Sequence, residues 1–166
     1  MIHIRNTRPG DIPALADIER SSAALFRGTH MEFAIDHPPL GAATHEAGIA
    51  EGSHWIAEVD GARAGFCCAQ AIDDLLYIAE LSVGQAYQRL GLGRALMDAA
   101  IAHAKANCAG ACLITDRELA WNRPFYATLG FADWDEPSAA AKAILADEIE
   151  GGFDPATRCA MILRFR

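Results

Sequence analysis

The sequence predicts an α/β (α+β) fold: a single domain over residues 1–166 with a mixed, mostly antiparallel central sheet of about six or seven strands flanked by helices. Three observations lead to this prediction. Three strand-like runs follow one another between residues 53 and 83, separated by short acidic turns. Helix-like and strand-like segments alternate in the rest of the chain. The length of 166 residues, 52% of them hydrophobic, suits one domain with a substantial core.

The N-terminal part begins with a strand and an amphipathic helix. Ile2 and Ile4 alternate with polar residues, and a period of two is typical of a strand. Between residues 12 and 25, apolar side chains recur every three or four positions after a Pro-Gly-Asp start, which predicts a helix. Residues 27–52 show weak periodicity, so we expect a loop or a short helix there.

The middle of the chain predicts an antiparallel meander. Strand-like runs cover residues 53–59, 62–72 and 75–83. Asp60-Gly61 separates the first two, and Asp-Gly between apolar runs is a strong signal for a tight hairpin.

The C-terminal part alternates helices and strands. A regular apolar pattern predicts a helix from about residue 91 to residue 107. Further elements follow: a strand over 111–116, a short helix stopped by Gly130, a strand, a helix between Ser138 and Gly151, and a last strand over 158–165.

Composition excludes several classes of function. Fourteen basic against 22 acidic residues give a net charge of −8, which disfavours nucleic acid and favours a cationic ligand. No stretch approaches the ~18 apolar residues of a membrane helix, and no targeting segment is recognisable, so we expect a cytoplasmic protein that binds no membrane.

Cysteine and histidine spacing does not indicate a metal site. The five cysteines form no CxxC pair and are expected to be buried free thiols. His30, His37 and His45 are seven and eight residues apart in the segment without clear periodicity. We expect them to be surface or substrate-pocket histidines and expect no bound metal.

A glycine-containing turn after the third strand of the meander indicates an anion site. Gly91 and Gly93 stand at the start of the helix, where free N–H groups and the helix dipole favour an anion. Arg89 and Arg94 add positive charge. The turn matches neither GxGxxG nor GxxxxGK[ST]; it matches Q-x-x-G-x-G from Gln88 to Gly93.

A second motif, about thirty residues further along the chain, helps to interpret this turn. V-x(4)-Q-x-x-G-x-G, from Val83 to Gly93, is followed by N-x-x-x-F-Y-x-x-L-G-F, from Asn122 to Phe131. Together with the order of elements, the two motifs resemble the GNAT superfamily of N-acetyltransferases over essentially the whole chain. The resemblance implies that acetyl-CoA is the co-substrate and that its pyrophosphate is the anion.

The resemblance also implies roles for individual residues. The strand that ends at Val83 is expected to be bulged and splayed, with the Val83 N–H directed at the thioester carbonyl. Asn122 is expected to contact the CoA arm, and Tyr126 to lie near its sulfur. The residues expected to bind acetyl-CoA are Leu81, Ser82 and Val83 along the pantetheine, Gln88, Arg89, Leu90, Gly91, Leu92, Gly93 and Arg94 around the pyrophosphate, and Asn122 and Tyr126.

Two positions depart from the common family pattern. Gln85 stands where members often have Pro, and Leu90 stands where they often have a basic or polar residue. Backbone N–H groups are unaffected by either change, whereas the side-chain contribution to phosphate binding is weakened.

Acetyl transfer to an amine needs a base and an acid. An alkyl ammonium has a pKa near ~10.4 and must lose a proton before it attacks, and Glu80, the lone carboxylate inside its strand, is the candidate base. Burial there would raise its pKa; the alternative is a Glu80 that faces solvent or pairs with an arginine. Tyr126 is the candidate acid for the leaving thiolate, with core packing as its alternative.

Three functions remain open on the sequence. The first is acetylation of a primary amine of a small molecule. The second is acetylation of a protein lysine or N-terminus, and the third is a non-catalytic sensor that binds acyl-CoA. The presence of both Glu80 and Tyr126 speaks against the sensor. Dimers are common in the family, so the resemblance also makes a homodimer an expectation.

Overall fold

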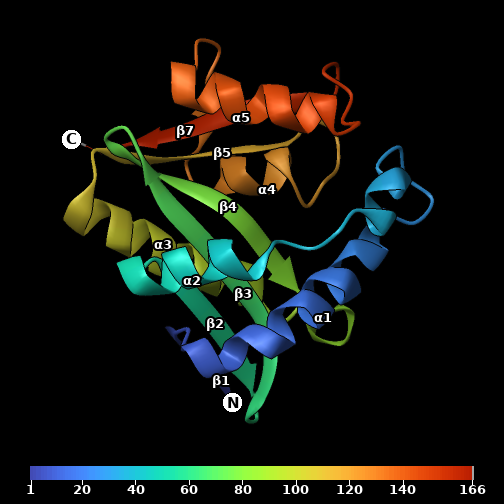
Figure 1. The fold of residues 1–166 in the computed structure, drawn as a ribbon, viewed down its shortest axis with the longest axis vertical. Coiled ribbons are helices and arrows are strands. Elements are labelled where there is room, and N and C mark those ends of the chain that lie inside the picture. The colour runs from blue at the N-terminus through green and yellow to red at the C-terminus, as the bar shows by residue number, and fades with distance from the viewer. Residues whose placement is uncertain (166) are drawn as a thin grey trace. The chain divides into compact units, whose positions relative to one another are not determined.

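A computed structural model describes residues 1–165, and its strands form one seven-stranded sheet in the order β1-β2-β3-β4-β5-β7-β6 (Figure 1). The strands are β1 Ile2–Asn6, β2 His54–Val59, β3 Ala62–Ile72, β4 Leu75–Val83, β5 Gly110–Asp116, β6 Ala132–Asp133 and β7 Arg158–Arg164. The helices are α1 Ile12–Ala23, α2 Ala42–Glu51, α3 Leu92–Asn107, α4 Arg123–Thr128 and α5 Ala139–Glu150, with 3₁₀ turns η1 Pro9–Asp11, η2 Ala24–Phe26, η3 Glu32–Asp36 and η4 Gln85–Tyr87. The predicted mixed, mostly antiparallel α/β fold is confirmed.

The chain groups into two compact units. Unit 1 contains residues 1–70 and 79–103, and unit 2 contains residues 71–78 and the chain from Ala104 onward. The expectation of a single domain over the whole chain stays a prediction. Among the described residues, no helix is both long and apolar enough to span a membrane.

Unit 1 is built on the antiparallel β1-β2-β3 meander. Ile2 pairs with Val59, and a tight turn links β2 to β3 with Asp60 at φ +49° and Gly61 at φ +84°. These left-handed angles are those that a two-residue hairpin requires, so the predicted hairpin is confirmed. The register between β2 and β3 shifts between Ala57 and Glu58, where β3 has one extra residue, Ala64; the bulge expected near Val83 stays a prediction.

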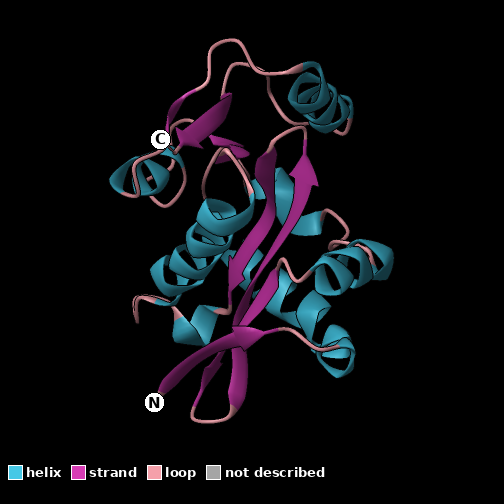
Figure 2. Cartoon of the chain, turned by 90° about the vertical axis from the view of Figure 1, so that its left-hand side faces the viewer, coloured by secondary structure: helices cyan, strands magenta, loops and turns pink. Residues whose placement is uncertain are grey.

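Helices cover both faces of the unit 1 strands. In Figures 1 and 2, α1 and α2 lie on one face of β2 and β3, and the first turns of α3 lie on the other. Under α1 the core contains Leu15, Ile18, Ile56, Phe66 and Cys68. The segment 27–52 is more ordered than expected, since it contains the ten-residue helix α2 as well as η3.

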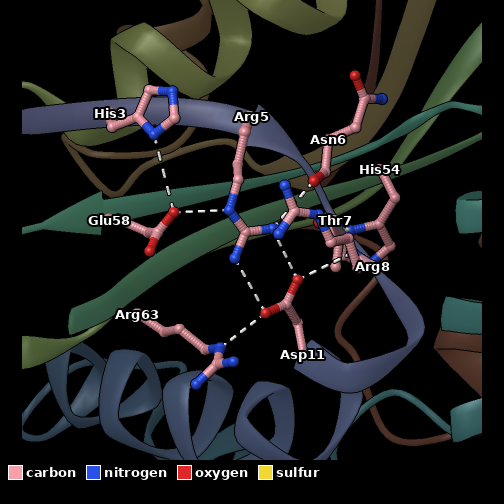
Figure 3. Close-up of polar contacts among 9 residues, drawn as sticks. All are labelled: His3, Arg5, Asn6, Thr7, Arg8, Asp11, His54, Glu58 and Arg63. Atoms are coloured by element: carbon pink, nitrogen blue, oxygen red, sulfur yellow. Dashed lines mark hydrogen bonds and ion pairs between the residues drawn. The ribbon is translucent and has the colours of Figure 1, made fainter. Parts of the chain in front are cut away.

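A buried ion-pair network joins β1 to the start of α1 (Figure 3). Both Arg5 Nη atoms donate to the Asp11 carboxylate at 2.8 and 3.0 Å, and Arg63 Nε donates to it at 2.7 Å. Arg5 Nε also donates to Glu58 at 2.6 Å. The hydrogen bond from Arg5 is the largest influence that holds the pKa of Asp11 well below its usual range.

Unit 2 contains the first part of β4 and the C-terminal strands. Leu75 to Tyr77 pair in parallel with β5, and β5 pairs antiparallel with β7. The α5 helix begins at the N-cap Ser138, whose hydroxyl accepts the Ala141 N–H. The Glu148 carboxylate near the end of α5 accepts a hydrogen bond from Arg158 on β7, which also lies 4.6 Å from the centre of the Phe153 ring.

The cysteines match the expectation of free thiols. All five are unbridged; Cys108 is half-buried and the other four are buried. Burial raises the pKa of Cys68 and of Cys112 to about 12, which makes both thiols poor nucleophiles.

Candidate active site

The carboxylate predicted to act as base lies on the second half of β4, in unit 1. Glu80 is half-buried, and its Oε1 accepts a hydrogen bond from Ser82 Oγ at 3.0 Å. Alternate residues of a strand share one face, so Glu80 and Ser82 point the same way. The charge of Glu80 contributes, after burial, to the raised pKa of the neighbouring Cys67 and Cys68 thiols on β3. Glu80 therefore faces the interior of unit 1 rather than bulk solvent alone.

The end of β4 is held close to β3 by glycine. A Cβ placed on Gly65 would lie 2.8 Å from the Ser82 carbonyl oxygen and 3.3 Å from Val83 Cα. The Gly84 N–H then donates to the Ala64 carbonyl at 2.8 Å. The backbone of Val83, predicted to present its N–H to the thioester, is thus fixed from both sides along the chain.

The turn after β4 is tied to the strand and to α1. Gln88 Nε2 donates to the Val83 carbonyl at 3.1 Å, which closes the turn onto the strand end. The Gln85 N–H donates to Ser21 Oγ of α1 at 2.9 Å. The turn is consequently anchored in unit 1 before the helix α3 begins.

Two of the predicted pyrophosphate residues have unusual backbone conformations. Arg89 and Gly91 adopt left-handed conformations with φ of +65° and +82°, on the two sides of Leu90. Binding of an anion by this turn stays a prediction. Arg89, Leu90, Gly91 and Arg94 are exposed, whereas the Leu92 side chain is buried in the core. A role of Leu92 in binding is thereby limited to its backbone.

Two of the predicted site residues, Asn122 and Tyr126, belong to unit 2. Asn122 precedes α4 and its carbonyl accepts the Tyr126 N–H at 3.0 Å, while its side chain makes no capping hydrogen bond. Tyr126 is 9% exposed, and its ring packs edge-on against Phe125 and Phe131. The packing that was the alternative to an acid role for Tyr126 is therefore present; it leaves the acid role a prediction.

The three histidines of residues 27–52 differ in their exposure. His30 is exposed and His37 is half-buried, but His45 is buried, so it is not a surface histidine. His45 lies instead beside His54 of β2, a contact that the sequence does not indicate because it joins a helix to a strand.

Sequence reasoning also missed Gly65 and Ser21. Their roles depend on which strand or turn lies next to them, and no local pattern marks such neighbours. The one signal for Gly65 in the sequence is that a glycine inside the strand-like run 62–72 often marks a close approach of another backbone.

Comparison with known proteins places this fold and turn in one family. A model of the acetyltransferase (GNAT) domain matches residues 50–133, just over half of the chain. The protein therefore belongs to the GNAT acetyltransferases and is an acetyl-CoA-dependent acetyl-transfer enzyme. All the predicted site residues, from Glu80 to Tyr126, lie inside the matched region.

Solved structures share the fold at low sequence identity. The ribosomal-protein-S18-alanine N-acetyltransferase of Escherichia coli is 22% identical with a TM-score of 0.69, over 99% of this chain and 94% of that one. The PaiA N-acetyltransferase of Thermoplasma acidophilum, solved with coenzyme A, is 16% identical with a TM-score of 0.68, over 99% of both chains. The N-acetylglutamate synthase of Neisseria gonorrhoeae, solved with coenzyme A and N-acetyl-glutamate, is 21% identical with a TM-score of 0.73, over 100% of this chain and 35% of that one.

Proposed function

We propose that the protein transfers the acetyl group of acetyl-CoA to a primary amine of a small molecule by direct attack on the thioester. The match of the GNAT domain to residues 50–133 is the observation on which this proposal rests, because that region contains the candidate base, the anion-binding turn and the candidate acid. The net charge of −8 favours an acceptor that is cationic before it reacts.

The turn and the strand end hold the co-substrate. In this proposal the amides of residues 88–94 bind the pyrophosphate, and Leu81 to Val83 pair with the pantetheine arm. The left-handed Arg89 and Gly91 and the anchored end of β4 support this assignment. Acetyl-CoA supplies the acetyl group as a thioester, and the Val83 N–H donates to the oxygen on which negative charge develops.

Glu80 and Tyr126 move the protons. Glu80 takes a proton from the acceptor ammonium, directly or through water, and the neutral nitrogen forms a bond to the thioester carbonyl carbon. The C–S bond breaks, and Tyr126 donates a proton to the leaving sulfur. The nitrogen then loses its second proton to solvent as the neutral amide forms, and a solvent proton restores the Tyr126 hydroxyl. The hydrogen bond from Ser82 Oγ orients the Glu80 carboxylate for this role.

A protein acceptor is the second candidate. The Escherichia coli neighbour named for the alanine of a ribosomal protein has almost the same length as this chain, since the match covers 94% of it. On this alternative the acceptor nitrogen is an α-amine or a lysine of a polypeptide, and the chemistry of Glu80 and Tyr126 is unchanged.

An acceptor panel tests the proposal. The protein is incubated with acetyl-CoA and either small amines or peptides with a free N-terminus or lysine, and release of free thiol is followed. Turnover with small amines supports the proposal, and turnover with peptides alone favours the alternative. Tight CoA binding without turnover of any acceptor indicates a sensor and contradicts the catalytic role.

Two variants test the assigned residues. Glu80→Gln is expected to lower kcat/KM at neutral pH by about 100-fold or more, and Tyr126→Phe by about tenfold or more, as is typical for loss of a general base or acid. Asp98→Asn, at an exposed position of α3, serves as the control and is expected to keep the activity. If both site variants retain wild-type rates, the assignment of base and acid is wrong.

A further inference from the structure

Three side chains that can ligate a metal meet in the interior of unit 1. His45 comes from α2, His54 from β2 and Cys68 from β3. Each is 2% exposed or less, and one nitrogen or sulfur atom of each lies within 4.8 Å of the others. None of them has a role in the proposed acetyl transfer.

The two imidazoles are already oriented. His54 Nδ1 lies 2.7 Å from Thr7 Oγ1, a residue that is also buried (Figure 3 labels both). His54 Nε2 lies 2.9 Å from Nδ1 of His45. A ligating histidine usually binds a polar neighbour through its second ring nitrogen, and Thr7 supplies this neighbour for His54. His54 Nε2 is therefore the atom that is directed into the cluster.

The second ring nitrogen of His45, the one that does not bind His54, lacks a partner. His45 Nε2 is buried and forms no hydrogen bond with the described residues. A buried polar atom without a partner costs free energy, and it is rare in folded proteins. The Thr44 carbonyl oxygen, 3.9 Å from Cys68 Sγ, adds an oxygen donor beside the same cluster.

The surroundings pack closely on the three side chains and keep both imidazoles neutral. A Cβ on Gly48 would lie 3.3 Å from Cys68 Sγ and 3.5 Å from His54 Cδ2, so only a glycine lets α2 come this near to the cluster. Burial lowers the pKa of both histidines, that of His54 to about 4, and therefore keeps them in the neutral form that ligates.

After burial, three carboxylates contribute to the raised pKa of the Cys68 thiol: Glu80, Glu19 and Glu51.

We propose that His45, His54 and Cys68 bind one zinc-class cation in the core of unit 1. On binding, Cys68 loses its proton to solvent and a metal–sulfur bond forms, while the two imidazoles bind as neutral ligands. Tetrahedral zinc with nitrogen and sulfur ligands separates its donor atoms by roughly 3.3–3.6 Å. His45 binds through Nδ1, which lies 2.9 Å from His54 Nε2, and all three donor atoms lie within 4.8 Å of one another, so the side chains have to shift to reach tetrahedral distances.

The site is structural rather than catalytic. It joins α2 to β2 and β3 and is separate from the anion-binding turn in sequence and in role. The proposal differs from the metal-free expectation drawn from sequence spacing, which compared His45 with His30 and His37 and not with His54.

Cobalt(II) provides the direct test, because thiolate coordination gives an intense sulfur-to-cobalt charge-transfer band. The full chain, stripped of metal and reduced, is titrated with Co²⁺ and then with Zn²⁺. We expect one Co²⁺ per chain with the charge-transfer band and a tetrahedral visible spectrum, and loss of both on addition of Zn²⁺. A protein that shows no such band overturns the proposal.

Matched variants assign the ligands. Cys68→Ser is expected to abolish the charge-transfer band, and His45→Gln to weaken Co²⁺ binding by tenfold or more. The control is Cys112→Ser, a buried thiol of unit 2, which is expected to leave the spectrum unchanged. A band that persists in Cys68→Ser contradicts the site.

A measurement on the unaltered chain keeps the test decisive if a variant does not fold. X-ray absorption at the zinc edge of the wild-type protein is expected to show one sulfur near ~2.3 Å and nitrogens near ~2.0–2.1 Å. A shell of nitrogen and oxygen alone overturns the proposal. Because acetyl transfer is not measured in either test, the result does not depend on the proposed function.

Discussion

The close approach of Gly65 on β3 to the backbone of Ser82 and Val83 on β4 leads to a quantitative prediction. Gly65→Ala adds a methyl group that would lie 2.8 Å from the Ser82 carbonyl oxygen and 3.3 Å from Val83 Cα and Val83 Cγ2. Two of these three neighbours are backbone atoms, which no side-chain rotation can move. Ordinary van der Waals contact begins at 3.4 Å, so the Ser82 carbonyl has to move by roughly 0.6 Å.

This displacement sets the expected magnitudes. Forcing a methyl group into a packed site costs about 1–3 kcal/mol of unfolding free energy. A misplacement of about 1 Å at a reacting group costs about 100-fold in rate, so a shift of this size next to Val83 is expected to lower kcat by about tenfold. The KM for acetyl-CoA is expected to change less, because the pyrophosphate turn is anchored separately by Ser21 and Gln88.

Steady-state kinetics with acetyl-CoA and urea unfolding measure both effects. Gly10→Ala is the matched control, since a Cβ there meets nothing within 4 Å, and it is expected to stay within about 0.5 kcal/mol and to keep its kcat. If Gly65→Ala loses stability but keeps the wild-type kcat, the backbone of Val83 does not set the rate, and the reasoning is refuted.

Three further predictions concern stability, pH and binding. Asp11→Asn removes the buried carboxylate that pairs with both Arg5 and Arg63 and leaves Arg5 paired with Glu58 alone. It is expected to lower the unfolding free energy by about 3 kcal/mol, whereas Asp17→Asn, at an exposed pair, should change it by less than about 1 kcal/mol in urea titrations. In the metal-free protein, burial lowers the pKa of His54 to about 4, against about 6.5 in the unfolded chain. The contribution of His54 to stability is therefore complete above pH ~6.5, and up to about 3 kcal/mol is lost as the pH drops to ~4. NMR titration of the His54 ring protons should show a neutral imidazole in the folded protein at pH 5, and a protonated ring at that pH contradicts the prediction. Gln88→Met removes the hydrogen bond to the Val83 carbonyl and is expected to raise the KM for acetyl-CoA about fivefold. The control Gln85→Met keeps the backbone N–H bond to Ser21 and is expected to leave this KM unchanged. Equal KM values for the two variants would count against the anchoring role of Gln88.

The sequence predicted the strands and most helices because their signals are local. The period of two in 53–83 and the Asp60-Gly61 turn are determined by neighbours along the chain, and both appear in the structure. The α2 helix was predicted less clearly because its buried positions include His45 and Gly48 rather than large apolar residues. A helix that buries polar and glycine residues lacks the apolar stripe from which helices are recognised.

The candidate site was predictable only where a motif is local. The turn from Gln88 to Gly93 could be identified from its letters, since its chemistry depends on backbone N–H groups. The support behind it could not, because the approach of Gly65 to Ser82 and the bond of Ser21 to Gln85 join segments far apart in sequence. Asp11 illustrates the same limit: it looks like a helix-start residue and is in fact the buried counter-ion of Arg5.

The two departures from the family pattern follow from how the turn is anchored. Gln85 replaces a proline, which has no N–H, and its N–H binds Ser21 Oγ, so the substitution gains a link between the turn and α1. Leu90 replaces a basic or polar residue, but its side chain is half exposed and the turn is held by Gln88 instead. Contacts within unit 1 therefore hold this turn without a proline at position 85 or a charged side chain at position 90, because an anion cradle needs its backbone held in place and not any one side chain.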